Sequence, residues 1–237
     1  MLLARRTLLS AAPLFLSAIA SAAARAPSAR LRLEPALADM VALTGPGIRR
    51  PLLLPAAGTV LLAELACGSE NLTVARFALE DDGAMLEWAA VALAQDGAVT
   101  LLALEPLAWR AAPQIGRPSA RMATRFASAG DRSRVLWQRD VAVRETPTLW
   151  RREAWTDYLA WTPPHGLADA PVRPPVPGTH QHQVAQWRRR AAALVASAPR
   201  ALTPAALASA GLQAASFSLA TSATPLIRQP SGPRIIV

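Results

Sequence analysis

The sequence predicts a mainly β protein, an antiparallel meander that forms a sheet or a partial barrel, followed by C-terminal helices; an α+β arrangement is the alternative. Between residues 58 and 143, short apolar runs alternate with turn residues. Asp-Gly stands between apolar runs twice, at 82–83 and 96–97, and this dipeptide is a strong hairpin signal. The runs follow one another at a spacing typical of a meander.

Six strands are expected from these runs, at 59–66, 72–80, 84–93, 98–109, 121–127 and 134–143. The last of them places Val135, Trp137, Val141 and Val143 on one face, because side chains alternate along a strand. The middle strands are apolar on both faces, so a second layer should cover the sheet.

The segment 146–161 is predicted to be a helix that supplies this cover, with a strand as the alternative. Thr146-Pro147 is a good helix entry, a capping hydroxyl followed by proline at the first turn. Four residues then recur at helical spacing: Trp150, Ala154, Tyr158 and Trp161.

The chain divides into five parts. Residues 1–24 are an expected export signal, 25–57 an extended lead-in with a turn at Gly45-Pro46-Gly47, and 58–161 the β-rich domain. A linker over 162–179 contains six prolines. Residues 180–237 form a helical appendage with a loose tail, in which a basic helix over 181–198 precedes a short helix from Thr203-Pro204 to Gly211.

The composition limits the function classes. The 25 basic residues are all arginine, and the formal net charge is +9. Nucleic-acid binding is not expected, because no clustered basic stripe or recognisable module is present. Cys67 is the only cysteine, so the fold cannot contain an intramolecular disulfide, and a buried free thiol is expected.

The N-terminus has the features of an export signal. Arg5 and Arg6 precede an apolar run that is short and rich in alanine, and small residues follow it. The string from Arg5 to Leu9 resembles the twin-arginine export signal; an ordinary Sec signal or an uncleaved anchor are the alternatives. The resemblance implies the export machinery as a partner and a periplasmic or secreted location. The apolar run is short for a spanning helix, and no transmembrane segment is expected in the mature chain. Twin-arginine cargo often carries a cofactor, but no motif identifies one here.

Few residues suggest catalysis or metal binding. Glu87 is the candidate catalytic carboxylate, because an acid between Leu86 and Trp88 could have a raised pKa and donate a proton. His180 and His182 could share a metal ion from an extended segment. No third ligand accompanies them in a spaced motif, so no metal site is assigned.

An aromatic and basic stretch is the candidate ligand site. Large aromatic residues and arginines are interleaved there, and they could bind a sugar or an anion or simply fill the core. The residues chosen are Trp137, Trp150, Arg152, Trp155, Tyr158 and Trp161.

The function expected is that of an exported periplasmic binding or accessory protein, non-enzymatic, for a small-molecule or envelope ligand. An exported hydrolase with scattered catalytic residues is the alternative. A third possibility is attachment to anionic lipid through Arg188–Arg190.

Overall fold

A computed structural model describes residues 30–216, apart from residues 38 and 82 and the segments 112–119, 145–149, 164–165 and 171–173. The structure is mainly antiparallel β with helices near the C-terminus, which confirms the predicted fold class. The export signal with Arg5 and Arg6 and the tail after residue 216 lie outside the described residues.

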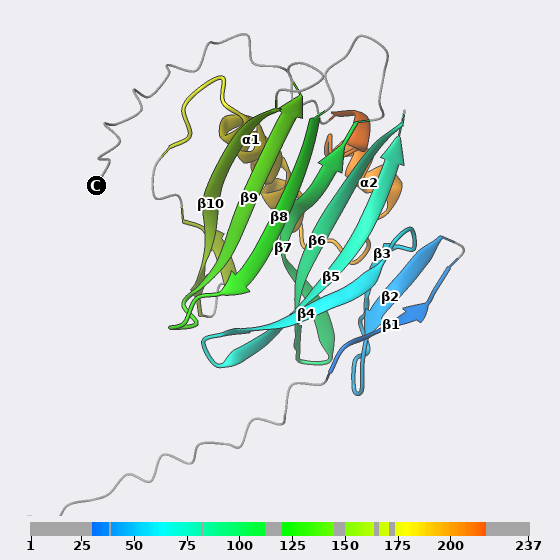
Figure 1. Cartoon of the computed structure of the whole chain (residues 1–237). Coiled ribbons are helices and arrows are strands. Elements are labelled where there is room, and N and C mark those ends of the chain that lie inside the picture. The colour runs from blue at the N-terminus through cyan, green and yellow to red at the C-terminus, as the bar shows by residue number, and fades with distance from the viewer. Residues whose placement is uncertain are drawn as a thin grey trace, which may run out of the picture.

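The main element is an eight-stranded antiparallel sheet in which each strand pairs with the next along the chain (Figure 1). Its strands are β4 (Val60–Cys67), β5 (Glu70–Asp81), β6 (Ala84–Gln95), β7 (Ala98–Arg110), β8 (Ala120–Ser128), β9 (Arg134–Arg144), β10 (Trp150–Thr162) and β11 (Gly166–Asp169). The six strands expected from the sequence are β4 to β9, and their bounds agree within two residues at every end.

The Asp-Gly turn between β6 and β7 has the expected backbone. Asp96 and Gly97 both adopt positive φ, at 53° and 72°. A two-residue turn of this kind matches the right-handed twist of the two strands that it joins. The hairpin therefore follows from the local sequence alone.

The predicted helix over 146–161 is wrong, because β10 is a strand, as the alternative had it. It pairs with β9 from Trp150 opposite Arg144 to Ala160 opposite Arg134. The same stretch also alternates, with Glu153, Trp155 and Asp157 on one face of the strand. Pairing with a long neighbouring strand decides between two local patterns that both fit.

A three-stranded sheet occupies the region expected to be an extended lead-in. Its strands are β1 (Arg32–Pro35), β2 (Met40–Thr44) and β3 (Leu52–Pro55). The expected turn after β2 is present, because the backbone N–H of Ile48 donates to the carbonyl of Gly45 at 3.1 Å. β3 is linked to the segment that joins the two C-terminal helices, since the N–H of Leu53 donates to the carbonyl of Arg200 at 2.9 Å.

Two helices and a 3₁₀ turn cover one face of the large sheet (Figure 1). They form the second layer that the apolar faces of the middle strands predict. They are α1 (His180–Ala196), α2 (Pro204–Ser209) and η1 (Ala214–Ser216). Threonine hydroxyls cap both helices. Thr179 accepts from the N–H of His182, and Thr203, where the sequence predicts the start of the second helix, accepts from that of Ala206. None of the described helices is long and apolar enough to cross a membrane.

The core has two parts because β5 and β6 are apolar on both faces. Phe77 and Trp88 lie in the part that α1, α2 and the small sheet cover, while Val74 and Val91 lie in the other part. This second part is enclosed because the sheet curls, and the N–H of Gly68 after β4 donates to the carbonyl of Arg132 after β8 at 2.9 Å. Cys67 is a buried free thiol there, as expected, and burial raises the pKa of this thiol.

Candidate functional site

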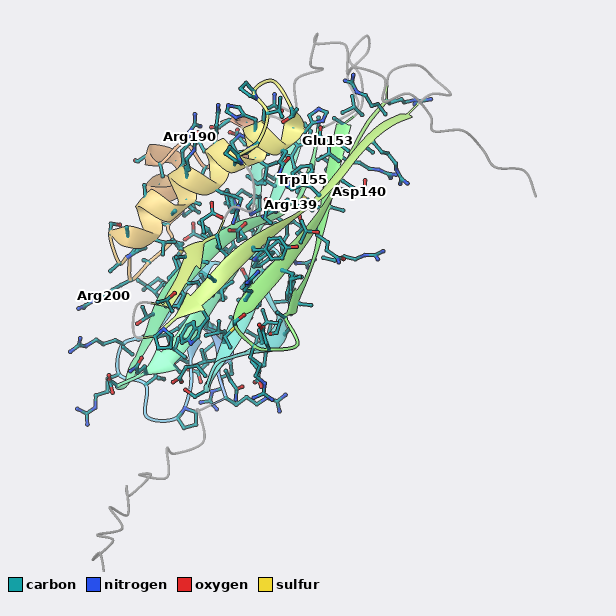
Figure 2. The ribbon with its side chains drawn as sticks, turned by 90° about the vertical axis from the view of Figure 1, so that its left-hand side faces the viewer. Arg139, Asp140, Glu153, Trp155, Arg190 and Arg200 are labelled. Carbon is teal, nitrogen blue, oxygen red and sulfur yellow. The ribbon has the colours of Figure 1, made fainter. Side chains whose placement is uncertain are left out.

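An open hollow of about 600 Å³ lies on the outer face of β8, β9 and β10. Figure 2 shows its central residue, Asp140, on the side of these strands that faces away from α1, whereas Arg139 and Glu153 lie on the helix side. The residues that line the hollow are Arg121, Ala123, Arg125, Gln138, Arg139, Asp140, Arg152, Ala154, Trp155 and Thr156.

The strand register explains the shape of the hollow. In the central row, Asp140 of β9 lies between Ala123 of β8 and Ala154 of β10. The two alanine side chains fill little space, so the surface is depressed on either side of the aspartate. In the next row, Gln138 lies between Arg125 and Thr156.

Arginines surround this depression. Arg121 and Arg152 lie on either side of Ala142, one row from Asp140, and Arg125 lies one row away in the opposite direction. Arg125 and Arg152 are exposed, and within the described part of the chain neither is held in an ion pair. Arg125 and Arg152 together outweigh the single exposed carboxylate of Asp140, which gives the hollow a positive potential.

The inner face of the same strands carries a buried network of ions centred on Arg139. This side chain is fully buried, and it donates from Nε to Asp157 at 2.6 Å and from Nη2 to Glu105. Its Nη1 donates to the hydroxyl of Thr124 at 3.2 Å and to the carbonyl of Pro106. A buried cation needs such partners, because an unpaired charge in the interior is very costly.

Arg188 of α1 extends this network to the helix. Its Nε donates to the two carboxylate oxygens of Glu105 at 3.0 and 2.9 Å. Its other nitrogens lie 3.6 Å from Asp157 and 3.2 Å from Asp169. Burial lowers the pKa of Arg188, but the charges of these three acids outweigh it and raise the pKa above its ordinary value.

The first turn of α1 rests on Glu153 of β10. The carboxylate of Glu153 accepts from the backbone N–H groups of His180 and Gln181, both at 3.2 Å, and contacts Nδ1 of His180 at 2.9 Å. A carboxylate at a helix N-terminus meets the positive end of the helix dipole. Burial raises the pKa of Glu153, but the hydrogen bonds and charge from His180 and the N–H of Gln181 outweigh it, and the pKa lies below its ordinary value.

The two faces of β9 and β10 therefore act together. Arg139 and Trp155 belong to the inner network, and the indole N–H of Trp155 donates to Asp157 at 3.2 Å. Along the chain, each of them directly precedes a residue of the outer face that lines the hollow, Asp140 and Thr156 respectively. Ion pairs to β7 and α1 hold the strands that carry the hollow, so its arginines project from a rigid frame.

The structure divides the predicted ligand residues between these two faces. Arg152 and Tyr158 belong to the outer face, and Arg152 lines the hollow. Trp137 is fully buried, and Trp155 and Trp161 pack against the core from the inner face. The side chain of Trp150 lies outside the described residues. The face proposed from the sequence is thus not one surface.

The predicted metal and catalytic candidates are also separated. His180 faces Glu153, whereas Nε2 of His182 contacts the side-chain amide of Gln186 at 3.0 Å. No group of three or more His, Cys, Asp or Glu that could hold a metal ion occurs among the described residues. The carboxylate of Glu87 lies 3.5 Å from the guanidinium of Arg76.

Sequence reasoning missed most of the hollow. Arg121, Ala123 and Arg125 alternate on the polar face of a strand, which was a visible signal. Their relation to Asp140 and Arg152 depends on the register with β9 and β10, which the sequence does not state. Comparisons of the chain with protein families, with curated proteins and with solved structures found no match.

Proposed function

We propose that this protein is an exported, non-enzymatic binding or accessory protein that holds an anionic ligand in the arginine-rimmed hollow. One observation carries the proposal: Arg125 and Arg152 come from different strands, are exposed, and line the same hollow without an acidic partner in the described part of the chain. Guanidinium groups in such positions suit carboxylate, sulfate or phosphate, because their fork of donors matches these oxygens.

The composition of the hollow favours binding over catalysis. Its lining contains one exposed carboxylate, Asp140, and no histidine or cysteine among the described residues. General acid–base chemistry usually needs two titratable groups with different pKa values. Glu87, the candidate catalytic residue, is not among the lining residues and lies beside Arg76 instead.

The place of action proposed is the periplasm or the exterior. Arg5 and Arg6, followed by a short apolar run and small residues, support transport by the twin-arginine or the Sec route. An anion-binding protein in that compartment would meet small anions and acidic envelope components. This location is compatible with a ligand site that is open to solvent.

A thermal-shift series tests the proposal. The purified protein is heated with phosphate, sulfate, small carboxylates, neutral sugars, lipids and haem, each over a range of concentrations. We expect Tm to rise with anionic ligands, because a ligand that binds only the folded state stabilises it by mass action. In the Arg125→Gln and Arg152→Gln variants, affinity should fall about tenfold for each lost charged hydrogen bond.

Arg189→Gln is the matched control, because Arg189 is exposed on α1 and is not among the residues that line the hollow. It removes the same charge and should leave the affinity within about twofold. The proposal fails if no anion raises Tm, or if all three variants weaken binding equally. The second result would show that net charge, and not the hollow, attracts the anion.

A further inference from the structure

We infer that the ligand of the hollow is an acidic saccharide, whose acid groups bind the arginines and whose hydroxyl groups donate to Asp140. The inference rests on the proposed function and deepens it by naming the class of ligand. It starts from the position of Asp140, which a site for a simple anion would not need.

Asp140 occupies the middle of the hollow, between Ala123 and Ala154. Its side chain is exposed and is not held in an ion pair within the described part of the chain. Phosphate or sulfate bound by the arginines would lie close to this negative charge, and the screened repulsion would weaken its binding slightly. A ligand with hydroxyl groups beside its acid groups turns this charge into a strong acceptor, because hydrogen bonds to carboxylates are stronger than neutral ones.

The spacing of the arginines favours an extended ligand with several acid groups. Arg125 on β8 and Arg152 on β10 are offset by four residues along the strand direction, which is about 13 Å at the rise of a strand. Arg152 lies two strands from β8, a lateral separation of about 10 Å. A chain of acidic sugars has its carboxylates or phosphates at intervals, so it can pair with both arginines while its hydroxyl groups reach Asp140 between them. A single small anion can pair with both only if the two side chains converge on it.

Other residues on this face also suit a sugar. Gln138 and Thr156 line the hollow one row from Asp140, and both can donate to and accept from hydroxyl groups. Tyr158 is the next outward residue of β10 after Thr156 and is half-buried. Its ring adds a flat apolar surface with a polar end, against which the apolar side of a sugar ring can pack.

Isothermal titration calorimetry with the full exported chain tests the inference. The probes are an oligogalacturonate, the neutral oligogalactoside of the same length, and inorganic sulfate. We expect the wild-type protein to bind the acidic oligomer, to bind the neutral one much more weakly, and to bind sulfate weakly. Arg125→Gln and Arg152→Gln should each weaken binding of the acidic oligomer about tenfold.

Asp140→Ala is the decisive variant, because it separates a saccharide from a plain anion. Loss of the hydroxyl contacts should lower the affinity for oligogalacturonate about tenfold. The affinity for sulfate should rise about twofold, since the screened repulsion that is relieved is small. Asp140→Asn keeps a neutral acceptor and should give an intermediate affinity for the oligomer. Unchanged unfolding curves would confirm that these variants are folded.

The outcomes distinguish the inference from the proposed function. If Asp140→Ala binds oligogalacturonate as well as the wild type does while the arginine variants lose it, the saccharide inference is overturned and anion binding stands. If neither sulfate nor the oligomer binds, both are overturned. A final experiment adds vesicles that carry a glucuronosyl lipid. Competition between these vesicles and the free oligomer for the protein would support the inference and show that the headgroup alone is recognised.

Discussion

At the scale of single residues, Glu105 is a buried acid that joins the two buried arginines of the network. It is 3% exposed and contacts both buried arginines, Arg139 and Arg188. Glu105→Gln would leave these two cations with less compensation in the interior. We expect the free energy of unfolding to fall by about 3–5 kcal/mol, since removing one partner of a buried pair leaves an uncompensated charge. Urea denaturation gives this value directly.

Glu87→Gln is the control for that measurement. Glu87 and Arg76 form a pair at 3.5 Å on the same sheet, but both side chains reach solvent. Exposed pairs contribute about 1 kcal/mol or less, so this variant should unfold close to the wild type. A loss below about 1 kcal/mol for Glu105→Gln would mean that the buried network is not needed for stability.

The buried network could have been anticipated in part from the sequence. Arg139 lies between Trp137 and Val141 on the apolar face of a strand, so a buried cation was visible in the pattern. Glu105 lies within an apolar run in the same way. The sequence does not show that these two ions meet. Their contact depends on the short pairing of β7 with β8, which stops at Ala108 opposite Ala123, and on where α1 crosses the sheet.

Arg188 illustrates the same limit. As part of Arg188–Arg190 it belongs to a basic cluster that could touch anionic lipid. The structure separates the cluster, because Arg188 is 7% exposed within the network while Arg189 and Arg190 remain exposed. Which residue of a helix faces the core is set by its periodicity, and an arginine on that face is recognised only when its acidic partners are known.

At the scale of elements, α1 is held to β10 by a contact that needs the ionised carboxylate of Glu153. The pKa of Glu153 is lower in the folded chain than its ordinary value of 4.5. Ionised Glu153 therefore stabilises the folded state above that value, and this contribution is lost as the pH falls through the lowered pKa. Glu153→Gln should cost about 1 kcal/mol near neutral pH, and the difference from the wild type should vanish in acid.

Urea unfolding of the two proteins from about pH 7 to about pH 3 measures this difference. Glu34→Gln is the control, because the pair of Glu34 with Arg32 on β1 is exposed. The idea fails if the Glu153→Gln difference is the same at every pH. It also fails if Glu34→Gln shows the same pH dependence.

The elements themselves differed in how well the sequence specified them. The hairpins from β4 to β9 were predictable, because turn residues and apolar runs agree locally. The strand β10 was mistaken for a helix, since the segment fits both periods. The small sheet from β1 to β3 was not foreseen, because its strands have four or five residues and gain their stability from packing on the large sheet and from pairing near Arg200.

At the scale of the whole molecule, closure of the curled sheet depends on Gly68. This glycine has φ +55°, and a Cβ built on it would lie 2.7 Å from the indole nitrogen of Trp161. The backbone N–H of Gly68 also binds the carbonyl of Arg132, and that of Trp161 binds the carbonyl of Ser133 at 2.8 Å. The first hairpin of the sheet and its later strands therefore meet at one position that has no room for a side chain.

We expect Gly68→Ala to lower the free energy of unfolding by about 2–3 kcal/mol. The left-handed backbone costs an L-residue roughly 1–2 kcal/mol, and displacement of the Trp161 ring adds the cost of disturbed packing. Gly130→Ala is the matched control, because its Cβ would meet nothing within 4 Å and its φ is not left-handed; it should be neutral or slightly stabilising. Equal unfolding curves for the two variants would show that the contact at Gly68 does not close the sheet. The residues that line the hollow do not include Gly68 or Trp161. Gly68→Ala should therefore weaken the fold while leaving the affinity of the folded protein for its ligand within about twofold.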